Sequence, residues 1–140
     1  MAIENLIGTW KLVSHRFVAT ESGEFKEMFG PAPTGSLIIS ADNHMIALIT
    51  ADGRTPATDA ASEATLFKTM LSYAGSLRIE GDQFITTVDV SWHPAWVGTE
   101  QARAFSVQNG TLLLMTPELP SPAFDGQLAR GILTWEKAQS

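Results

Sequence analysis

Hydrophobic and polar residues alternate along this chain in short runs separated by Gly, Pro, Asn and Asp. Alternation with a period of two is typical of strands with one buried face, and the separating residues favour turns. Residues 29–35 include prolines that cannot donate to a strand ladder, so this segment is predicted to be a loop. The pattern predicts strands at residues 8–18, 24–28, 36–40, 45–51, 76–80, 84–92, 102–108, 111–116 and 128–136. About eight or nine short strands predict an all-β antiparallel sandwich or barrel.

One segment, residues 59–74, follows a helical period instead. Its apolar positions recur at helical spacing and are Ala64, Phe67, Met70, Leu71 and Ala74. Asp59 or Ser62 is suited to cap the start of the helix, and Gly75 to end it. A single amphipathic helix between strands needs a surface to cover. We therefore expect this helix to cover one end of a barrel.

Composition narrows the class of protein. The chain has 140 residues and no linker or repeat, so residues 1–140 are predicted to form one domain. A formal net charge of −6 argues against nucleic acid and anionic membrane as partners, because phosphate binding needs a basic face. The absence of cysteine excludes disulfides and thiolate chemistry. No apolar run is long enough to span a membrane, and we expect a cytoplasmic protein.

The first predicted strand opens on a Gly-x-Trp motif, Gly8-Thr9-Trp10. Further motifs follow in the order Pro33-Thr34-Gly35-Ser36-Leu37, Tyr73-Ala74-Gly75, Ser91-Trp92-His93-Pro94-Ala95-Trp96-Val97-Gly98-Thr99-Glu100-Gln101-Ala102-Arg103 and Leu133-Thr134-Trp135-Glu136. This ordered set resembles the bacterial and fungal lipocalin-like domain family and extends over nearly the whole chain. The resemblance implies a small antiparallel calycin-type β-barrel with an interior cavity.

The resemblance does not imply a single function, because related barrels serve as carriers, isomerases, cyclases and decarboxylases. The chain also departs from the family pattern at two places. Asp42-Asn43-His44-Met45 stands where the family commonly has Asp-Gly-Arg-Met. Thr86 occupies a position where the family often has a histidine facing the barrel. If that histidine carries chemistry in relatives, this chain lacks it.

Arg103 is the most informative charged residue. It shares strand parity with a phenylalanine two residues on, so it is expected to face the barrel interior. A buried guanidinium needs a partner. In resembling barrels the tryptophan at the position of Trp10 closes one end and stacks beneath a basic side chain, which Arg103 or Arg130 would supply here. The other partners are a carboxylate, Asp89 or Glu100, or an acidic or carbonyl oxygen of a ligand.

The first strand also carries polar residues of interest. Alternation from its start points Ser14 and Arg16 inward and His15 to solvent, unless a bulge intervenes. His44 lies at a predicted hairpin tip and is expected to be solvated. His93 lies in a rim loop between two tryptophans. It is the best candidate for a general acid or base, because histidine titrates near neutral pH.

An apolar cavity with few polar groups is the usual form of a small-molecule site. We expect ligand contacts from inward polar side chains and from rim residues, namely Arg103, Ser14, Arg16, Thr86, Trp92, Trp96, Tyr73, Phe67 and Met70. His93 and Arg103 are the weak catalytic candidates. The histidines share no metal-ligand spacing, and nucleotide motifs are missing, so no metal and no cofactor are expected.

Three functions are compatible with these features. The first is binding of a small hydrophobic molecule with an acidic or carbonyl end in the barrel cavity, as a carrier or sensor. The second is a cofactor-independent isomerase, cyclase or lyase for an apolar, polyketide-like substrate, since positioning alone lowers a barrier by about 7–11 kcal/mol. The third is a filled structural barrel or a homodimer through exposed strand faces, because small barrels leave little interior space.

Overall fold

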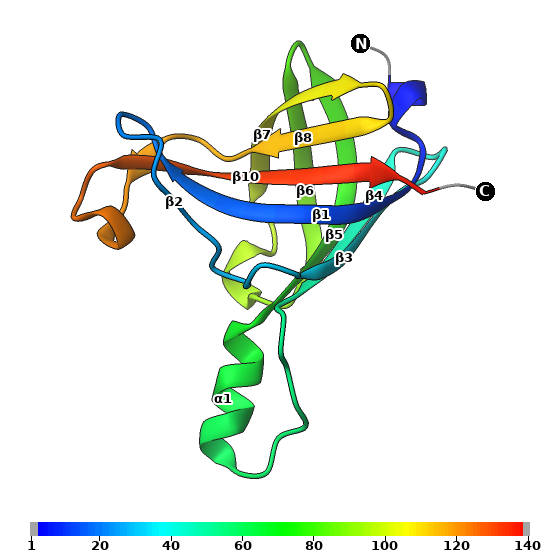
Figure 1. Ribbon diagram of the computed structural model, residues 1–140. Coiled ribbons are helices and arrows are strands. Elements are labelled where there is room, and N and C mark those ends of the chain that lie inside the picture. The colour runs from blue at the N-terminus through cyan, green and yellow to red at the C-terminus, as the bar shows by residue number, and fades with distance from the viewer. Residues whose placement is uncertain (1–2, 139–140) are drawn as a thin grey trace.

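The computed structural model describes residues 3–138 and confirms the predicted all-β antiparallel barrel (Figure 1). Eight strands close the barrel through pairing of the first with the last. In order around the barrel they are β1 (Gly8–Ala19), β3 (Thr34–Ile39), β4 (His44–Thr50), β5 (Met70–Glu80), β6 (Gln83–Ser91), β7 (Glu100–Gln108), β8 (Thr111–Met115) and β10 (Leu128–Lys137).

Two short strands and three 3-10 helices complete the described chain besides one α-helix. Strand β2 (Phe25–Lys26) pairs with β1, and β9 (Leu119–Pro120) pairs with β10. The 3-10 helices are η1 (Ile3–Leu6), η2 (Pro94–Trp96) and η3 (Pro122–Phe124). Figure 1 shows β1 and β10 side by side, with β2 near the end where β1 finishes and β10 begins. No helix within residues 3–138 is long and apolar enough to cross a membrane.

The alternation read from the sequence places the core inside the barrel. In β4, Met45, Ala47 and Ile49 are buried, whereas Ile46 and Leu48 between them are exposed on the outer face. Side chains from all eight barrel strands join in one buried apolar cluster, part of which forms the wall of the cavity described below. Removing this apolar surface from water is the main stabilising contribution to the fold.

Trp10 lies in this cluster and is almost completely buried. Its indole Nε1 donates a hydrogen bond to the Leu6 carbonyl at 2.8 Å, which ties η1 across the barrel end. The basic group that stacks on its ring is Lys137, with Nζ 4.8 Å from the ring centroid. The expectation that Arg103 or Arg130 fills this role is wrong. Lys137 is available because β10 runs antiparallel to β1 and places it opposite Trp10.

The helix α1 (Ala60–Lys68) is shorter than predicted. Asp59 caps it as expected, accepting a hydrogen bond from the Ser62 amide at 2.8 Å. Residues 70–74 belong instead to β5, where they pair with β4 from Thr50↔Met70 onward. Cross-strand pairing has overridden local helical periodicity here. Figure 1 shows α1 projecting from the barrel, and none of its residues is buried, so it does not seal the barrel end.

Candidate ligand-binding site

A cavity of about 230 Å³ lies inside the barrel, and Trp10 is not among the residues that line it. Its wall is mostly aliphatic and aromatic, with a few polar side chains among them. The lining residues are His15, Leu37, Met45, Ala47, Ile49, Leu71, Tyr73, Trp96, Arg103, Leu114, Thr116, Leu133 and Trp135. We refer to it as the barrel cavity. An apolar wall with few polar groups is the usual character of a small-molecule site.

His15 enters the barrel cavity because β1 contains a bulge. Leu12 pairs with Trp135, but Ser14 pairs with Thr134, so the register skips Val13. Since directly opposite residues share a face, His15 points inward beside its cavity-lining neighbour Leu133. The regular alternation predicted the reverse, and that prediction is wrong for His15.

Arg16 consequently faces outward, where its guanidinium lies 4.4 Å from the centroid of the Phe25 ring. Its Nε is 4.0 Å from a carboxylate oxygen of Glu27. Ser14 likewise does not line the barrel cavity. The expectation that Ser14 and Arg16 point inward is therefore corrected by the same one-residue bulge.

The imidazole of His15 is held in an apolar environment. Its ring packs edge-on against Phe29, with centroids 5.2 Å apart. Its Nδ1 is buried without a hydrogen-bond partner among the described residues. Burial lowers the pKa of His15 below its usual range, because desolvation disfavours the charged form. The cavity therefore contains a neutral imidazole at neutral pH.

Arg103 lines the barrel cavity from β7, on the face that strand parity predicted. Its Nη1 donates to the Ala102 carbonyl at 2.9 Å, and its Nη2 donates to Gln101 Oε1 at 3.3 Å. Both acceptors are neutral. Among residues 3–138, no carboxylate forms an ion pair with this guanidinium. Most of its N–H donors therefore have no partner among the described residues.

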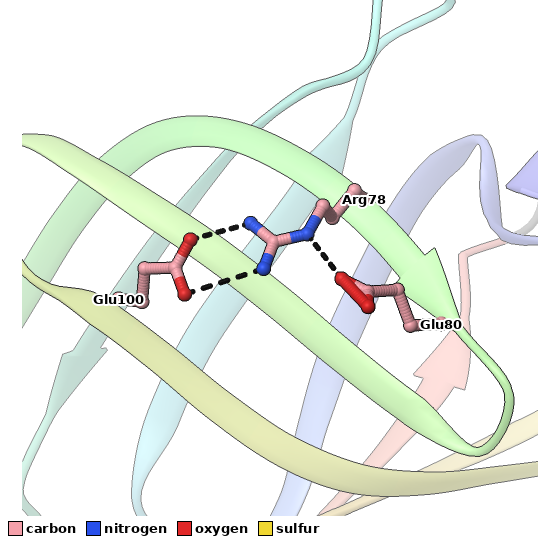
Figure 2. A network of polar contacts seen from close by, with 3 residues as sticks. All are labelled: Arg78, Glu80 and Glu100. Atoms are coloured by element: carbon pink, nitrogen blue, oxygen red, sulfur yellow. Dashed lines mark hydrogen bonds and ion pairs between the residues drawn. The ribbon is translucent and has the colours of Figure 1, made fainter.

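Neither of the two carboxylates predicted as partners of Arg103 pairs with it. Glu100 accepts from Arg78 at 2.6 and 3.2 Å, and Arg78 also contacts Glu80, as Figure 2 shows. These hydrogen bonds from Arg78 hold the pKa of the Glu100 carboxyl below its usual range, so it stays ionised and paired. Asp89 is exposed next to an irregularity in the β5–β6 pairing.

Three aromatic residues form part of the cavity wall. Tyr73 and Trp96 meet edge to face with ring centroids 5.2 Å apart. Burial raises the pKa of the Tyr73 hydroxyl, and the positive charge of Arg103 opposes part of this shift. The indole Nε1 of Trp135 is buried without a partner in the described part of the chain. The Tyr73 hydroxyl and the Arg103 guanidinium are therefore polar groups of the same cavity wall.

A second, larger depression of about 640 Å³ adjoins the barrel cavity on the outside of the barrel. One side is the start of β7, residues 100–103, and the other is the segment 116–123. Met28 and Phe17 contribute from the β1–β2 region. We refer to it as the outer groove. Arg103 and Thr116 line both the groove and the barrel cavity.

The barrel architecture agrees with the family to which the sequence is similar. A family model described as a lipocalin-like domain matches residues 7–138. The chain belongs to this lipocalin-like domain family. No curated protein matches the sequence. Membership of the family establishes the lipocalin-like fold but does not identify a ligand. A function must therefore be argued from the residues that line the cavity.

Several predicted contact residues lie outside this lipocalin-like cavity. Trp92 stacks on Phe67 with centroids 5.2 Å apart and donates its Nε1 hydrogen bond to the Phe67 carbonyl at 3.0 Å. His93 packs edge-on against Phe67 at 5.4 Å and next to Trp96, but does not line the cavity. Met70 lines a shallow surface depression with Trp92. Trp92 and His93 of the rim loop therefore pack against Phe67 of α1.

The departures from the family pattern also have a structural account. Asn43 adopts a φ of 64° at the β3–β4 turn, a left-handed conformation that asparagine tolerates in place of glycine. Thr86 faces inward and is fully buried, but its hydroxyl lies outside the cavity lining and has no partner in the described chain. Within residues 3–138, no group of three His, Cys, Asp or Glu side chains could hold a metal ion.

Proposed function

We propose that the barrel binds one small apolar molecule through a carbonyl or carboxylate oxygen placed at Arg103, and that the protein serves as a carrier or sensor of that molecule. The observation that supports this proposal is an unpaired guanidinium in the wall of a mostly apolar cavity. A charge in such a place is unfavourable unless an anion or a strong acceptor joins it. A ligand oxygen supplies that partner.

The size of the cavity limits the ligand head. A water molecule occupies about 30 Å³ in the liquid, so 230 Å³ holds roughly eight groups of that size. A single ring with a short polar substituent fits this space. The presence of this volume also argues against a barrel filled by its own side chains.

The alternative is a cofactor-independent isomerase, cyclase or lyase, and one observation favours it. His15 is a neutral imidazole in the same cavity as the cation of Arg103. A neutral imidazole can take a proton from a carbon next to a carbonyl, while the guanidinium stabilises the enolate oxygen. An enzyme of this kind would exchange the methyl hydrogens of bound acetophenone with solvent deuterium. His15→Gln would stop the exchange without changing the affinity.

Binding in the cavity is tested first by native mass spectrometry of the purified chain, with solvent extraction of any bound molecule. Titration calorimetry with sodium benzoate then follows, because benzoate joins one ring to one carboxylate. We expect benzoate to bind the unmodified chain. We expect Ala47→Leu to abolish this binding, since Ala47 lines the cavity and the larger side chain takes up its space.

Ala74→Leu is the matched control, because Ala74 lies on the adjacent strand β5 at surface depressions outside the barrel cavity. It should bind benzoate as the unmodified chain does. Equal benzoate affinity in Ala47→Leu and the unmodified chain would place the binding elsewhere and overturn the proposal. A chain that carries no extra mass and does not bind benzoate would overturn it as well.

A further inference from the structure

The barrel wall is open between β7 and β8 at one level. Their ladder extends from Ala104↔Met115 to Gln108↔Thr111 and no further. Residues 100–103 of β7 pair with β6 on one side, but their other edge has no strand partner among the described residues. We refer to this gap in the ladder as the side opening, and Arg103 and Thr116, which line both the outer groove and the barrel cavity, lie at it.

The opening exists because the chain stays with β10 after β8. The Thr116 amide donates to the Gly131 carbonyl at 3.0 Å, and the Gly131 amide donates to Thr116 Oγ1 at 2.7 Å. Three residues later, β9 again pairs with β10. The chain thus leaves β7 at Thr116 and follows the opposite wall, which produces the groove.

Arg103 lies at this opening and belongs to both spaces. Its guanidinium is bonded only to its own strand, through the Ala102 carbonyl and Gln101. Thr116, the other shared residue, is fixed to β10. Of the two residues shared by the groove and the cavity, Arg103 therefore has N–H donors without a protein partner, whereas the Thr116 hydroxyl is already hydrogen-bonded.

The outer groove is mostly apolar, and two of its large apolar side chains are highly exposed. Leu119 is 62% exposed and Met28 is 58% exposed, and both line it. Glu100 is the carboxylate of the groove and is held by Arg78 (Figure 2). Exposed apolar surface beside a cavity marks a place where ligand surface can be buried.

We propose that a single elongated ligand occupies both spaces, with a compact apolar head in the barrel cavity, a neutral internal carbonyl at Arg103 and an apolar tail in the outer groove. This inference rests on the proposed binding function and narrows the ligand class. A molecule that ends in a carboxylate at Arg103 leaves one of the two apolar spaces to water. An ester, ketone or amide with two apolar arms fills both.

Methyl benzoate and hexyl benzoate test this arrangement, because they share the ring and the carbonyl and differ only in the tail. Titration calorimetry should show hexyl benzoate binding the unmodified chain at least tenfold more tightly than methyl benzoate. Leu119→Asp should remove this difference and leave the affinity for methyl benzoate unchanged, since the new charge lies in the groove. Met28→Asp, which alters another part of the groove lining, should do the same.

Leu128→Asp is the matched control. Leu128 is 48% exposed, lies opposite β9 and lines neither space, so the tenfold difference should persist. If methyl benzoate binds and the longer ester binds no more tightly, the inference is overturned and the proposed function stands. The same holds if the difference survives in both groove variants. If neither ester binds, the proposed function fails together with the inference.

Discussion

Replacing Arg103 with methionine separates its contribution to binding from its contribution to folding. Met has a similar length and no charge, and it can pack against the apolar cavity wall. The native side chain gives one good hydrogen bond, to the Ala102 carbonyl at 2.9 Å, and one long contact at 3.3 Å to Gln101. The loss of one neutral-acceptor hydrogen bond costs about 0.5–1.5 kcal/mol.

This loss is partly offset because the half-buried, unpaired guanidinium no longer has to be partly desolvated in the wall. We expect the free energy of unfolding of Arg103→Met to stay within about 1 kcal/mol of the unmodified chain, which corresponds to roughly 2–5 °C in Tm for a domain of this size. Binding should respond far more. A hydrogen bond to a charged group is worth about 1.5–3 kcal/mol, so benzoate affinity should fall by about 10- to 150-fold.

Titration calorimetry with sodium benzoate and thermal unfolding followed by circular dichroism measure the two effects. Arg130→Met is the control, because it removes the same charge from β10 at a residue that lines neither the barrel cavity nor the outer groove. It should leave benzoate affinity unchanged. Benzoate binding by Arg103→Met at the affinity of the unmodified chain would refute the assignment. Loss of the folded state would show that the arginine is structural.

Three further predictions concern stability and charge. The pKa of His15 is lowered in the folded state, so the unfolded chain binds more protons as the pH falls below about 6.5. The free energy of unfolding should therefore decrease from about pH 7 to pH 5, and denaturant titrations should show a flatter profile for His15→Gln but not for the exposed control His44→Gln. Gly75→Ala should destabilise the fold by about 3 kcal/mol in the same assay, because its Cβ would meet a β6 carbonyl oxygen. That Cβ would lie 1.9 Å from the oxygen, so full stability in this variant would contradict the close approach of β5 and β6. Arg78→Met should release the Glu100 carboxylate at the edge of the outer groove and weaken benzoate binding severalfold in calorimetry, with little change in Tm. An unchanged benzoate affinity would contradict this prediction, since it would show that Glu100 does not pair with Arg103 when Arg78 is removed.

Much of the fold can be predicted from the sequence, because the strands alternate cleanly where one face is buried. Strand β4 is an example, with buried Met45, Ala47 and Ile49 between exposed residues. The same reasoning places Arg103 inside, and the family resemblance gives a closed barrel. The sequence also predicts Tyr73 and Trp96 as ligand contacts, and both residues lie in the cavity wall.

The parts that could not be predicted depend on contacts distant in the sequence. Met70 fits a helical period, but its pairing with Thr50 makes it the first residue of β5. Lys137 stacks on Trp10 because β10 closes against β1, a pairing that spans almost the whole chain. The inward position of His15 depends on a bulge whose only sequence signal is the unusual length of the first strand.

The bulge at Val13 has a consequence for how such barrels diversify. The bulge determines which side chains of the rest of β1 point inward: deleting Val13 would restore regular alternation, and His15 would stay inside, opposite Leu133. If β1 instead paired regularly with Val13 in the ladder, Arg16 would face the interior and His15 the solvent, so the cavity would gain a second permanent cation and lose its titratable base. A shift of one residue in the pairing of β1, with no substitution, would thereby change the net charge of the cavity wall. The presence of a bulge in the first strand is thus as informative about the charge of the cavity as the identities of the lining residues.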